Sequence, residues 1–371
     1  MEDRYVHQPM LTCIGNKRKL VGNIRAVVEE VGRLEGKEKM AIADGFAGST
    51  VVARELSYVS SELYVNDLEL YSYLLACSLV CPTPEQQKEV AQHLAEMNRL
   101  AENGPYVEGV ICALYAPKDT ADIKEGERCY YTRENALVID TLRLYLDNVP
   151  AEIRTYCMVP LLVKASINTN TGGVFKGFYK NGDVGCWGGK GGNALSRILK
   201  PIRVEMPIWH NCPVHPANLD IMDFIRSLPP IDLLYLDPPY NQHPYGSNYF
   251  MLNVIANNKF PTEMSKVSGI PTDWNKSVYN SKKEAADAMK RMIALGLTKA
   301  KYLLISYNNE GIIRDWTTML APYNVKKYQV DYDTYKGCRN LKKRNNKVIE
   351  IMYLVTSKSD AGPELTPPNN A

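Results

Sequence analysis

The segment 231–236, with the sequence IDLLYL, is the feature that most constrains the fold of this chain. A short apolar run of this kind is typical of a strand buried on both faces, as in a parallel sheet covered by helices. Asp237-Pro238-Pro239-Tyr240 follows directly, so the chain leaves the strand in a stiff turn. In open α/β sheets the chemistry lies at the carboxyl ends of strands. The segment therefore predicts an α/β fold with a site at 237–240.

A second unit near the N-terminus supports the same fold class. Residues 20–35 place apolar side chains at helical spacing, and 39–43 are a short apolar run typical of a strand. A glycine-containing turn at 44–49 follows, and 50–56 has helical character. This order of strand, glycine loop and helix is typical of a nucleotide-binding, Rossmann-like unit.

Changes of composition divide the chain into four parts. Residues 1–82 hold the first half of the α/β pattern, and 83–213 are expected to be an inserted region of loops, β-hairpins and two helices, at 84–102 and 134–146. The α/β pattern resumes in 214–356, with further strands expected at 301–306 and 348–355. The tail 357–371 has three prolines and no periodicity, so we expect it to be disordered.

The composition excludes several classes of protein. The chain has 44 Lys and Arg against 41 Asp and Glu, so it is no polycation, and a nucleic-acid surface must come from local clusters. No apolar run approaches the roughly 18 residues of a membrane span, and the N-terminus has no apolar signal core. Nine cysteines, none in a CxxC pair, are expected to be reduced thiols of a cytoplasmic protein that binds no metal.

The residue types at 237–240 suit chemistry on an exocyclic amine. Asp237 and the carbonyl of Pro238 are able to accept hydrogen bonds from an –NH₂ group and make its nitrogen more nucleophilic. Tyr240 offers a flat ring on which a base can stack. The alternative is that Asp-Pro-Pro is only a turn that ends a strand.

Acidic residues flank the glycine loop. Gly45 and Gly48 let the backbone approach a ligand closely, and Asp44 is placed to hold its amino or hydroxyl groups. Asp67 ends the next predicted strand, 62–66, about 20 residues after the loop, where an acid suits ribose hydroxyls. Asp220 is placed to accept a hydrogen bond from an adenine amine, or else caps a helix.

A cluster of basic residues near the C-terminus contains no acid. We expect it to contact phosphates, although a solvated turn would look the same. The cluster consists of Lys336, Arg339, Lys342, Lys343, Arg344 and Lys347.

With these residues in place, the sequence resembles the Dam-like, alpha-class DNA adenine N6-methyltransferases. Gly15 and Lys17 match the family's first motif, which lies beside the cofactor and the target adenine. The family's cofactor loop is matched by Phe46, Ala47, Gly48 and Ser49, but Thr50 stands in place of the second glycine. The ribose acid falls on Asp67 and the catalytic motif on Asp237–Tyr240. The region after that motif is similar to family members at Asn241, Tyr245, Asn248 and Tyr249.

The resemblance implies an S-adenosylmethionine-dependent enzyme that methylates the 6-amino group of an adenine flipped out of double-stranded DNA. It also implies that the insertion 83–213 reads the DNA sequence, and that the role is restriction–modification or epigenetic marking, with a cognate endonuclease as partner. We expect a monomer. Two alternatives stay open: methylation of the cytosine 4-amino group or an exocyclic amine in RNA, and a non-catalytic DNA-binding protein on the same scaffold.

Overall fold

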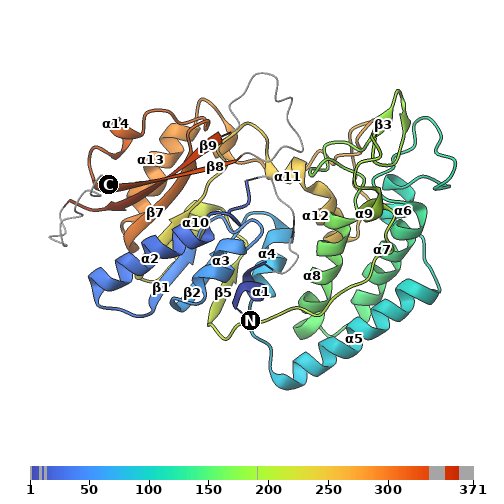
Figure 1. The fold of residues 1–371 in the computed structure, drawn as a ribbon, viewed down its shortest axis with the longest axis horizontal. Helices are drawn as coiled ribbons and strands as arrows, with labels where there is room; N and C mark the ends of the chain where they lie inside the picture. Colours follow the sequence, from blue (N-terminus) through green and yellow to red (C-terminus); the bar gives the residue numbers. More distant parts are fainter. Residues whose placement is uncertain (1, 8–10, 12–14, 190, 334–346, 359–371) are drawn as a thin grey trace.

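The computed structural model describes residues 2–7, 11, 15–189, 191–333 and 347–358. Its centre is a seven-stranded sheet with the order β5-β2-β1-β6-β7-β9-β8 (Figure 1). The strands are β1 (Met40–Asp44), β2 (Ser60–Asn66), β5 (Val214–Ala217), β6 (Ile231–Leu236), β7 (Ala300–Asn308), β8 (Asn324–Asp333) and β9 (Lys347–Thr356). The strands from β5 to β7 are parallel, and β9 and β8 extend the sheet antiparallel.

The strands predicted from the sequence are present. The runs at 39–43, 62–66, 231–236, 301–306 and 348–355 form β1, β2, β6, β7 and β9. Every residue of β6 is buried, as its apolar run predicts. The predicted α/β fold with a mainly parallel sheet is therefore confirmed.

The strand order reverses between β1 and β6. From β1 the chain continues outward through β2 to β5, and it then returns to place β6 on the other side of β1. Asp44 at the end of β1 lies opposite Tyr235 of β6, so the loops that follow these two strands are neighbours. A crevice at such a reversal is where ligands bind in open α/β sheets.

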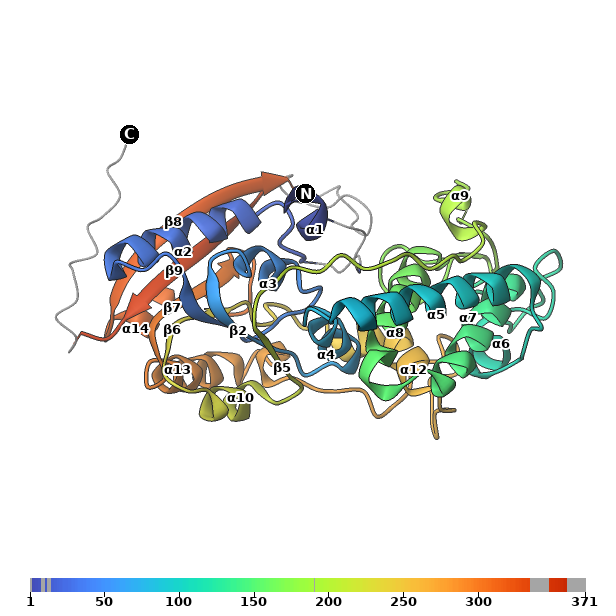
Figure 2. The same ribbon diagram turned by 90° about the horizontal axis from the view of Figure 1, so that it is seen from below.

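Helices cover both faces of this sheet (Figure 2). On one face, α1 (Glu2–His7), α2 (Val21–Glu35) and α3 (Val51–Leu56) share a buried cluster with Leu233 and Tyr235. On the other, α10 (Ile221–Ser227), α13 (Ala285–Gly296) and α14 (Trp316–Leu320) enclose Leu234 and Leu236. Alternate residues of β6 therefore face opposite layers, as the two-residue period of a strand requires.

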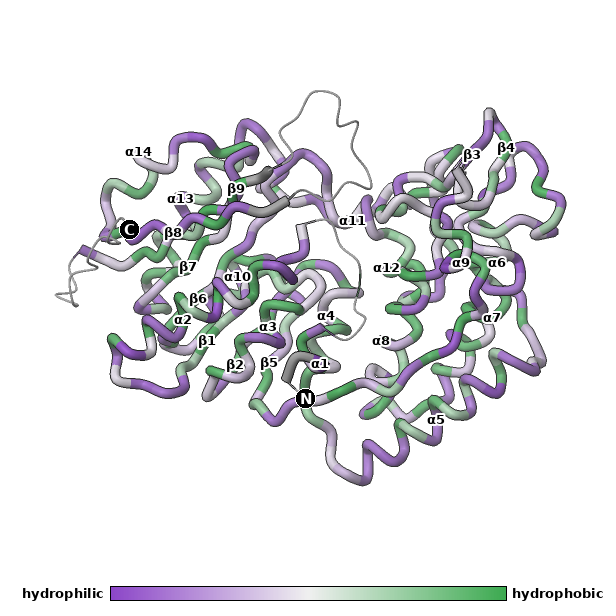
Figure 3. The backbone as a smooth tube through the Cα atoms, viewed as in Figure 1, coloured by the Kyte–Doolittle hydropathy of each residue, from purple (hydrophilic) through white to green (hydrophobic). Residues whose placement is uncertain are grey.

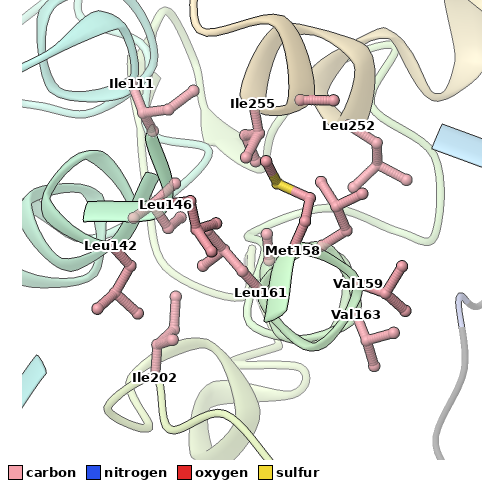
Figure 4. Packing of buried hydrophobic residues seen from close by; sticks show 14 of the residues in the cluster. Ile111, Leu142, Leu146, Met158, Val159, Leu161, Val163, Ile202, Leu252 and Ile255 are labelled. Atoms are coloured by element: carbon pink, nitrogen blue, oxygen red, sulfur yellow. The ribbon is translucent and has the colours of Figure 1, made fainter. Parts of the chain in front are cut away.

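A helical unit lies beside the sheet and has its own core. Its helices are α4 (Leu70–Cys77), α5 (Pro84–Asn103), α6 (Val110–Tyr115), α7 (Arg133–Tyr145) with the 3₁₀ turn η1 (Leu146–Asn148), α8 (Ala151–Ile167), α9 (Leu195–Ile198), α11 (Tyr245–Asn248) and α12 (Phe250–Asn257). Leu252 and Ile255 of α12 pack among Met158, Leu161 and other apolar side chains of this unit (Figure 4). The chain that leaves β6 thus runs directly from the sheet into the helical core.

The middle of the chain is more helical than its sequence suggests. The helices predicted at 84–102 and 134–146 are α5 and α7, but α8 was not expected. Because α8 is buried on most sides and contains Pro160, its apolar pattern lacks the periodicity that marks an amphipathic helix. The predicted hairpins reduce to one short pair, β3 (Lys180–Asn181) and β4 (Val184–Gly185).

The distribution of hydropathy follows these layers. Hydrophobic segments run through the central strands and α12, whereas hydrophilic residues interrupt α5 along its length (Figure 3). Among the described residues, no helix has both the length and the apolar character needed to cross a lipid bilayer.

Candidate active site

A cavity lies where the loops after β1, β2 and β6 meet, and it has a volume of about 980 Å³ including its open mouth. The structure brings together twelve of the residues expected from the sequence on its walls: Gly15, Lys17, Gly45, Phe46, Ala47, Gly48, Ser49, Asp67, Asp220, Asp237, Pro239 and Tyr245. Seven other expected residues lie in the part of the chain that the structure describes but do not line its walls: Asp44, Thr50, Pro238, Tyr240, Asn241, Asn248 and Tyr249.

The glycine loop after β1 forms one wall. The amide of Gly45 donates to the Tyr235 carbonyl at 3.0 Å, so the loop starts against β6. A Cβ at Gly45 would lie 2.7 Å from Ile221 Cδ1 and 3.0 Å from Leu236 Cδ2, so both apolar side chains would have to move to admit it. Gly48 has a φ of +52°, a conformation that glycine adopts without strain, and Thr50 repeats it at +62° before α3 begins.

Asp44 lies directly behind this loop and is fully buried. One oxygen accepts a hydrogen bond from the amide of Phe46 at 3.3 Å, while Oδ2 has no hydrogen-bond partner among the described residues. Burial raises the pKa of Asp44 to about 8. A buried acceptor without a partner beside the cavity suits a ligand that carries a hydrogen-bond donor.

Replacing Asp44 with asparagine is expected to stabilise the protein increasingly as the pH rises from 5 to 9. The pKa of Asp44 in the folded protein is about 8, above the usual value near 4. The wild-type protein therefore loses stability progressively as the pH rises from about 4 to about 8. Asparagine keeps the shape and the bond from Phe46 but does not titrate. Melting temperatures of the two proteins at pH 5, 7 and 9 test this, and a difference independent of pH would contradict the shifted pKa.

Three further acids surround the cavity. Asp67 accepts hydrogen bonds from the amides of Gly48 at 2.7 Å and Glu69 at 2.9 Å, and burial raises its pKa. Glu69 was not expected from the sequence: it lines the cavity, is 5% exposed and binds Asn253 at 2.7 Å. Burial and the nearby Asp67 raise the pKa of Glu69 to about 7. Its signal in the sequence was only a second acid two positions after Asp67.

Asp220 caps a helix, which was one of the two roles expected for it, and it also lines the cavity. Its side chain accepts a hydrogen bond from the amide of Met222 at 2.9 Å and so caps α10. The 3₁₀ turn η2 (Val278–Asn280) also lines the cavity through Tyr279 and Asn280, and the sequence did not predict this. Tyr279 packs edge-on against Phe46 with ring centroids 5.7 Å apart. This segment follows a long irregular connection, which has no periodic signal.

Asp237 lies at the tip of β6 in an ion-paired cluster. The Nζ atom of Lys17 is 2.8 Å from Asp237 Oδ1 and 3.2 Å from Glu350 Oε1. Burial raises the pKa of Asp237 to about 6, since Lys17 opposes this effect only in part and Glu350 adds to it. Burial by itself would lower the pKa of Lys17, but Asp237 and Glu350 raise it well above its usual range. The ion pair with Lys17 therefore stabilises the charged form of Asp237 at the cavity wall.

Tyr240 lies beside this cluster. Its ring centroid is 5.8 Å from the Nζ atom of Lys17, and the ring packs edge-on against Tyr307 at 6.3 Å. A Cβ at Gly15, whose φ is +79°, would lie only 2.8 Å from the Tyr240 hydroxyl and 3.3 Å from that of Tyr245. Gly15 thus lets the N-terminal segment pass close to both tyrosines.

The residues after Tyr240 divide into two groups. Asn241 is half-buried and accepts a hydrogen bond from Asn280 through its carbonyl at 2.6 Å, and Tyr245 lines the cavity. Asn248 and Tyr249 are only 6% and 2% exposed, and Tyr249 stacks on Tyr245. The buried pair therefore supports the helical core, which leaves Asn241 and Tyr245 as the candidates for contact with a base or phosphate.

The basic cluster lies almost entirely outside the described residues. This applies to Lys336, Arg339, Lys342, Lys343 and Arg344, and of Lys347 only its place as the first residue of β9 is described. Asp333 at the end of β8 pairs with Lys347, so the cluster belongs to the connection between two antiparallel strands. Its contact with phosphates stays a prediction.

Comparisons with known proteins agree with this geometry. Residues 14–319 match the family described as D12 class N6 adenine-specific DNA methyltransferase. The type II methyltransferase M.CviAII of Paramecium bursaria Chlorella virus 1 is 28% identical over 84% of this chain and 87% of its own length. The type II methyltransferase M.NlaIII of Neisseria lactamica is 26% identical over 93% of this chain and 99% of its own length. The modification methylase StsI of Streptococcus sanguinis is 27% identical over 93% of this chain, which spans 52% of that protein.

The family match covers both halves of the cavity, from the turn at Gly15 through the glycine loop to the end of β6 and beyond. The resemblance noted on the sequence motifs is therefore confirmed, and the chain belongs to the D12 class N6 adenine-specific DNA methyltransferase family.

Proposed function

We propose that this protein transfers a methyl group from S-adenosylmethionine to the 6-amino group of an adenine turned out of double-stranded DNA. The observation that carries the proposal is the position of Asp237 and Lys17 in the same cavity as the glycine loop. A purine inside a duplex cannot reach a cavity of this kind, so the target nucleotide must leave the stack at a cost of a few kcal/mol.

The walls of the cavity suit the cofactor. Asp67 and Glu69 are acceptors placed for ribose hydroxyls, and Asp44 holds an unpaired buried acceptor behind the glycine loop. Asp220 and the ring of Phe46 lie where an adenine group would meet one acceptor and one apolar face. When bound, S-adenosylmethionine supplies a methyl group on a positively charged sulfur.

Asp237 and Tyr240 act on the target base. We assign to Asp237 the hydrogen bond from the 6-amino group, together with the Pro238 carbonyl. The amino nitrogen forms the bond to the methyl carbon as the carbon–sulfur bond breaks, and the nitrogen then releases one proton. We assign that proton to the carboxylate of Asp237, which lines the cavity. Tyr240 supports the base through its ring, held by Tyr307 on one side.

The rest of the molecule serves recognition in this proposal. The region 83–213 reads the DNA sequence, Asn241 and Tyr245 contact the flipped nucleotide, and the basic cluster around Lys343 and Arg344 contacts phosphates. Since the relatives M.CviAII and M.NlaIII are named type II methyltransferases, we place the protein in restriction–modification. It would act in the cytoplasm, as a monomer beside a cognate endonuclease.

The nature of the methylated base is the direct test. Duplex DNA treated with the protein and S-adenosylmethionine is digested to nucleosides and analysed by mass spectrometry. N6-methyldeoxyadenosine is expected, and DNA treated with the Asp237→Ala variant provides the control. N4-methyldeoxycytidine would identify the cytosine amine as the substrate instead. Cofactor binding without any methylated product would favour a non-catalytic DNA-binding protein.

A further inference from the structure

One ammonium group serves two carboxylates in this site, the half-buried Asp237 and the buried Glu350. Lys17 is 3% exposed and lies within 3.2 Å of both Asp237 and Glu350. Glu350, on β9, is 1% exposed and accepts a hydrogen bond from Ser306 Oγ of β7 at 2.6 Å. Leaving a buried carboxylate without a counter-charge is costly, so a second acid beside Asp237 needs a reason.

The two carboxylates differ in their access to the cavity. Asp237 is on the cavity wall, whereas Glu350 is not among its lining residues and lies behind Lys17. The Lys17 ammonium binds Asp237 Oδ1 at 2.8 Å and so withdraws negative charge from the carboxylate that accepts the substrate amine in the proposed mechanism. An Asp237 held tightly by Lys17 would be a weaker acceptor for the incoming amine.

We propose that Glu350 is a positioning residue. When the substrate amine reaches Asp237, the Lys17 ammonium shifts from Asp237 to Glu350. The inference rests on the proposed role of Asp237. Ser306 fixes Glu350 Oε1 beside the lysine, so the ammonium needs to shift only between two acceptors already in contact with it. Asp237 then keeps its charge and gains a free lone pair. The other titratable groups around the cluster are Asp44, Tyr235 and Tyr240.

The test is Glu350→Gln, which keeps the size of the side chain and an acceptor for Ser306 but removes its charge. Lys17 then has only Asp237 as a charged partner. We expect the single-turnover rate of methylation to fall at least about tenfold, with the KM for S-adenosylmethionine changed by less than about twofold. Because the charge of Glu350 raises the pKa of Asp237, the acidic limb of the rate profile should also move to lower pH.

The matched control is Glu30→Gln. Glu30 of α2 likewise binds a lysine and a hydroxyl, namely Lys326 Nζ at 2.8 Å and the Tyr328 hydroxyl at 3.0 Å. Both partners are on β8, away from the cavity. This variant should keep the wild-type rate and acidic limb. The proposal would be overturned if Glu350→Gln kept the wild-type methylation rate and the wild-type acidic limb of the pH–rate profile. It would also be overturned if Glu30→Gln moved the acidic limb by the same amount.

Two further variants separate positioning from folding. Glu350→Asp should recover part of the rate lost in Glu350→Gln, because it restores the charge. Ser306→Ala should slow methylation by about two- to fivefold, since it releases Glu350 without removing its charge; an unchanged rate would overturn the proposal even if Glu350→Gln did not fold. If Asp237→Ala remains active, the proposed function of the site is wrong. That outcome is distinct from a failure of the proposal for Glu350, in which Asp237→Ala is inactive but Glu350→Gln is not impaired.

Discussion

The Asp237→Ala variant is expected to lose at least about two orders of magnitude in single-turnover methylation rate, because the substrate amine loses its charged acceptor. Its affinity for the cofactor should stay within a few-fold of wild type, since the glycine loop, Asp67 and Glu69 are untouched. The variant should fold, because Glu350 remains to neutralise Lys17. Methylation under single-turnover conditions and calorimetric titration with S-adenosylhomocysteine measure the two effects.

Two other substitutions make this experiment specific. Asp237→Asn keeps the shape of the side chain but loses the charge and one acceptor, so it should be nearly as slow as alanine. Asp223→Ala removes an exposed aspartate of α10 that pairs with Arg226 at 2.7 Å, and it should behave as wild type. Turnover retained in Asp237→Ala would refute the assigned role, and a loss of cofactor affinity as large as the loss of rate would make the residue a binding group.

The second large effect is expected for Gly15→Ala. A methyl group there would meet the Tyr240 hydroxyl at 2.8 Å, and Tyr240 has little room to move because its ring lies against Tyr307. We expect the rate of DNA methylation to fall at least about tenfold as the ring and the Lys17 segment shift. The left-handed backbone of Gly15 adds a loss of stability of about 1 kcal/mol.

Gly36→Ala is the matched control for the backbone effect. Gly36 ends α2 with a φ of +65°, and a Cβ there would meet no atom within 4 Å. Both variants should therefore lose similar stability in thermal melts, but only Gly15→Ala should lose activity. Equal methylation rates in the two variants would show that Gly15 does not set the position of Tyr240.

Local patterns were sufficient for five strands of the sheet and for much of the cavity, whereas β5 and β8 were not expected from the sequence. The run 231–236 became β6, the turn at 44–49 became the loop that lines the cavity, and Asp67 followed β2 as expected. Each of these signals lies within one short window of sequence, where apolar spacing and glycine report directly on backbone conformation. Because parallel strands end on the same edge of a sheet, such windows also predicted which loops would meet.

Features that depend on distant parts of the chain were not visible in the same way. The helix α12 reads as another apolar segment after the turn at 237–240, and only its packing on α8 and α4 shows that it completes the helical core. The 3₁₀ turn η2 reaches the cavity through an irregular connection whose path no periodicity reveals.

The sequence by itself determined the class of fold, and it predicted Asp237, Tyr240, Lys17 and the glycine loop as site residues. Only the tertiary structure decided that Glu350 shares the ammonium of Lys17 with Asp237. The physical reason is that β9 pairs antiparallel with β7 in a register that sets Glu350 opposite Asn308, two positions from Ser306 along β7. The Glu350 side chain then lies on the same face as Ser306 and accepts a hydrogen bond from its hydroxyl. Strand pairing joins segments that are distant in the sequence. The role of a single acid in an apolar strand therefore becomes visible only when the strands beside it are known.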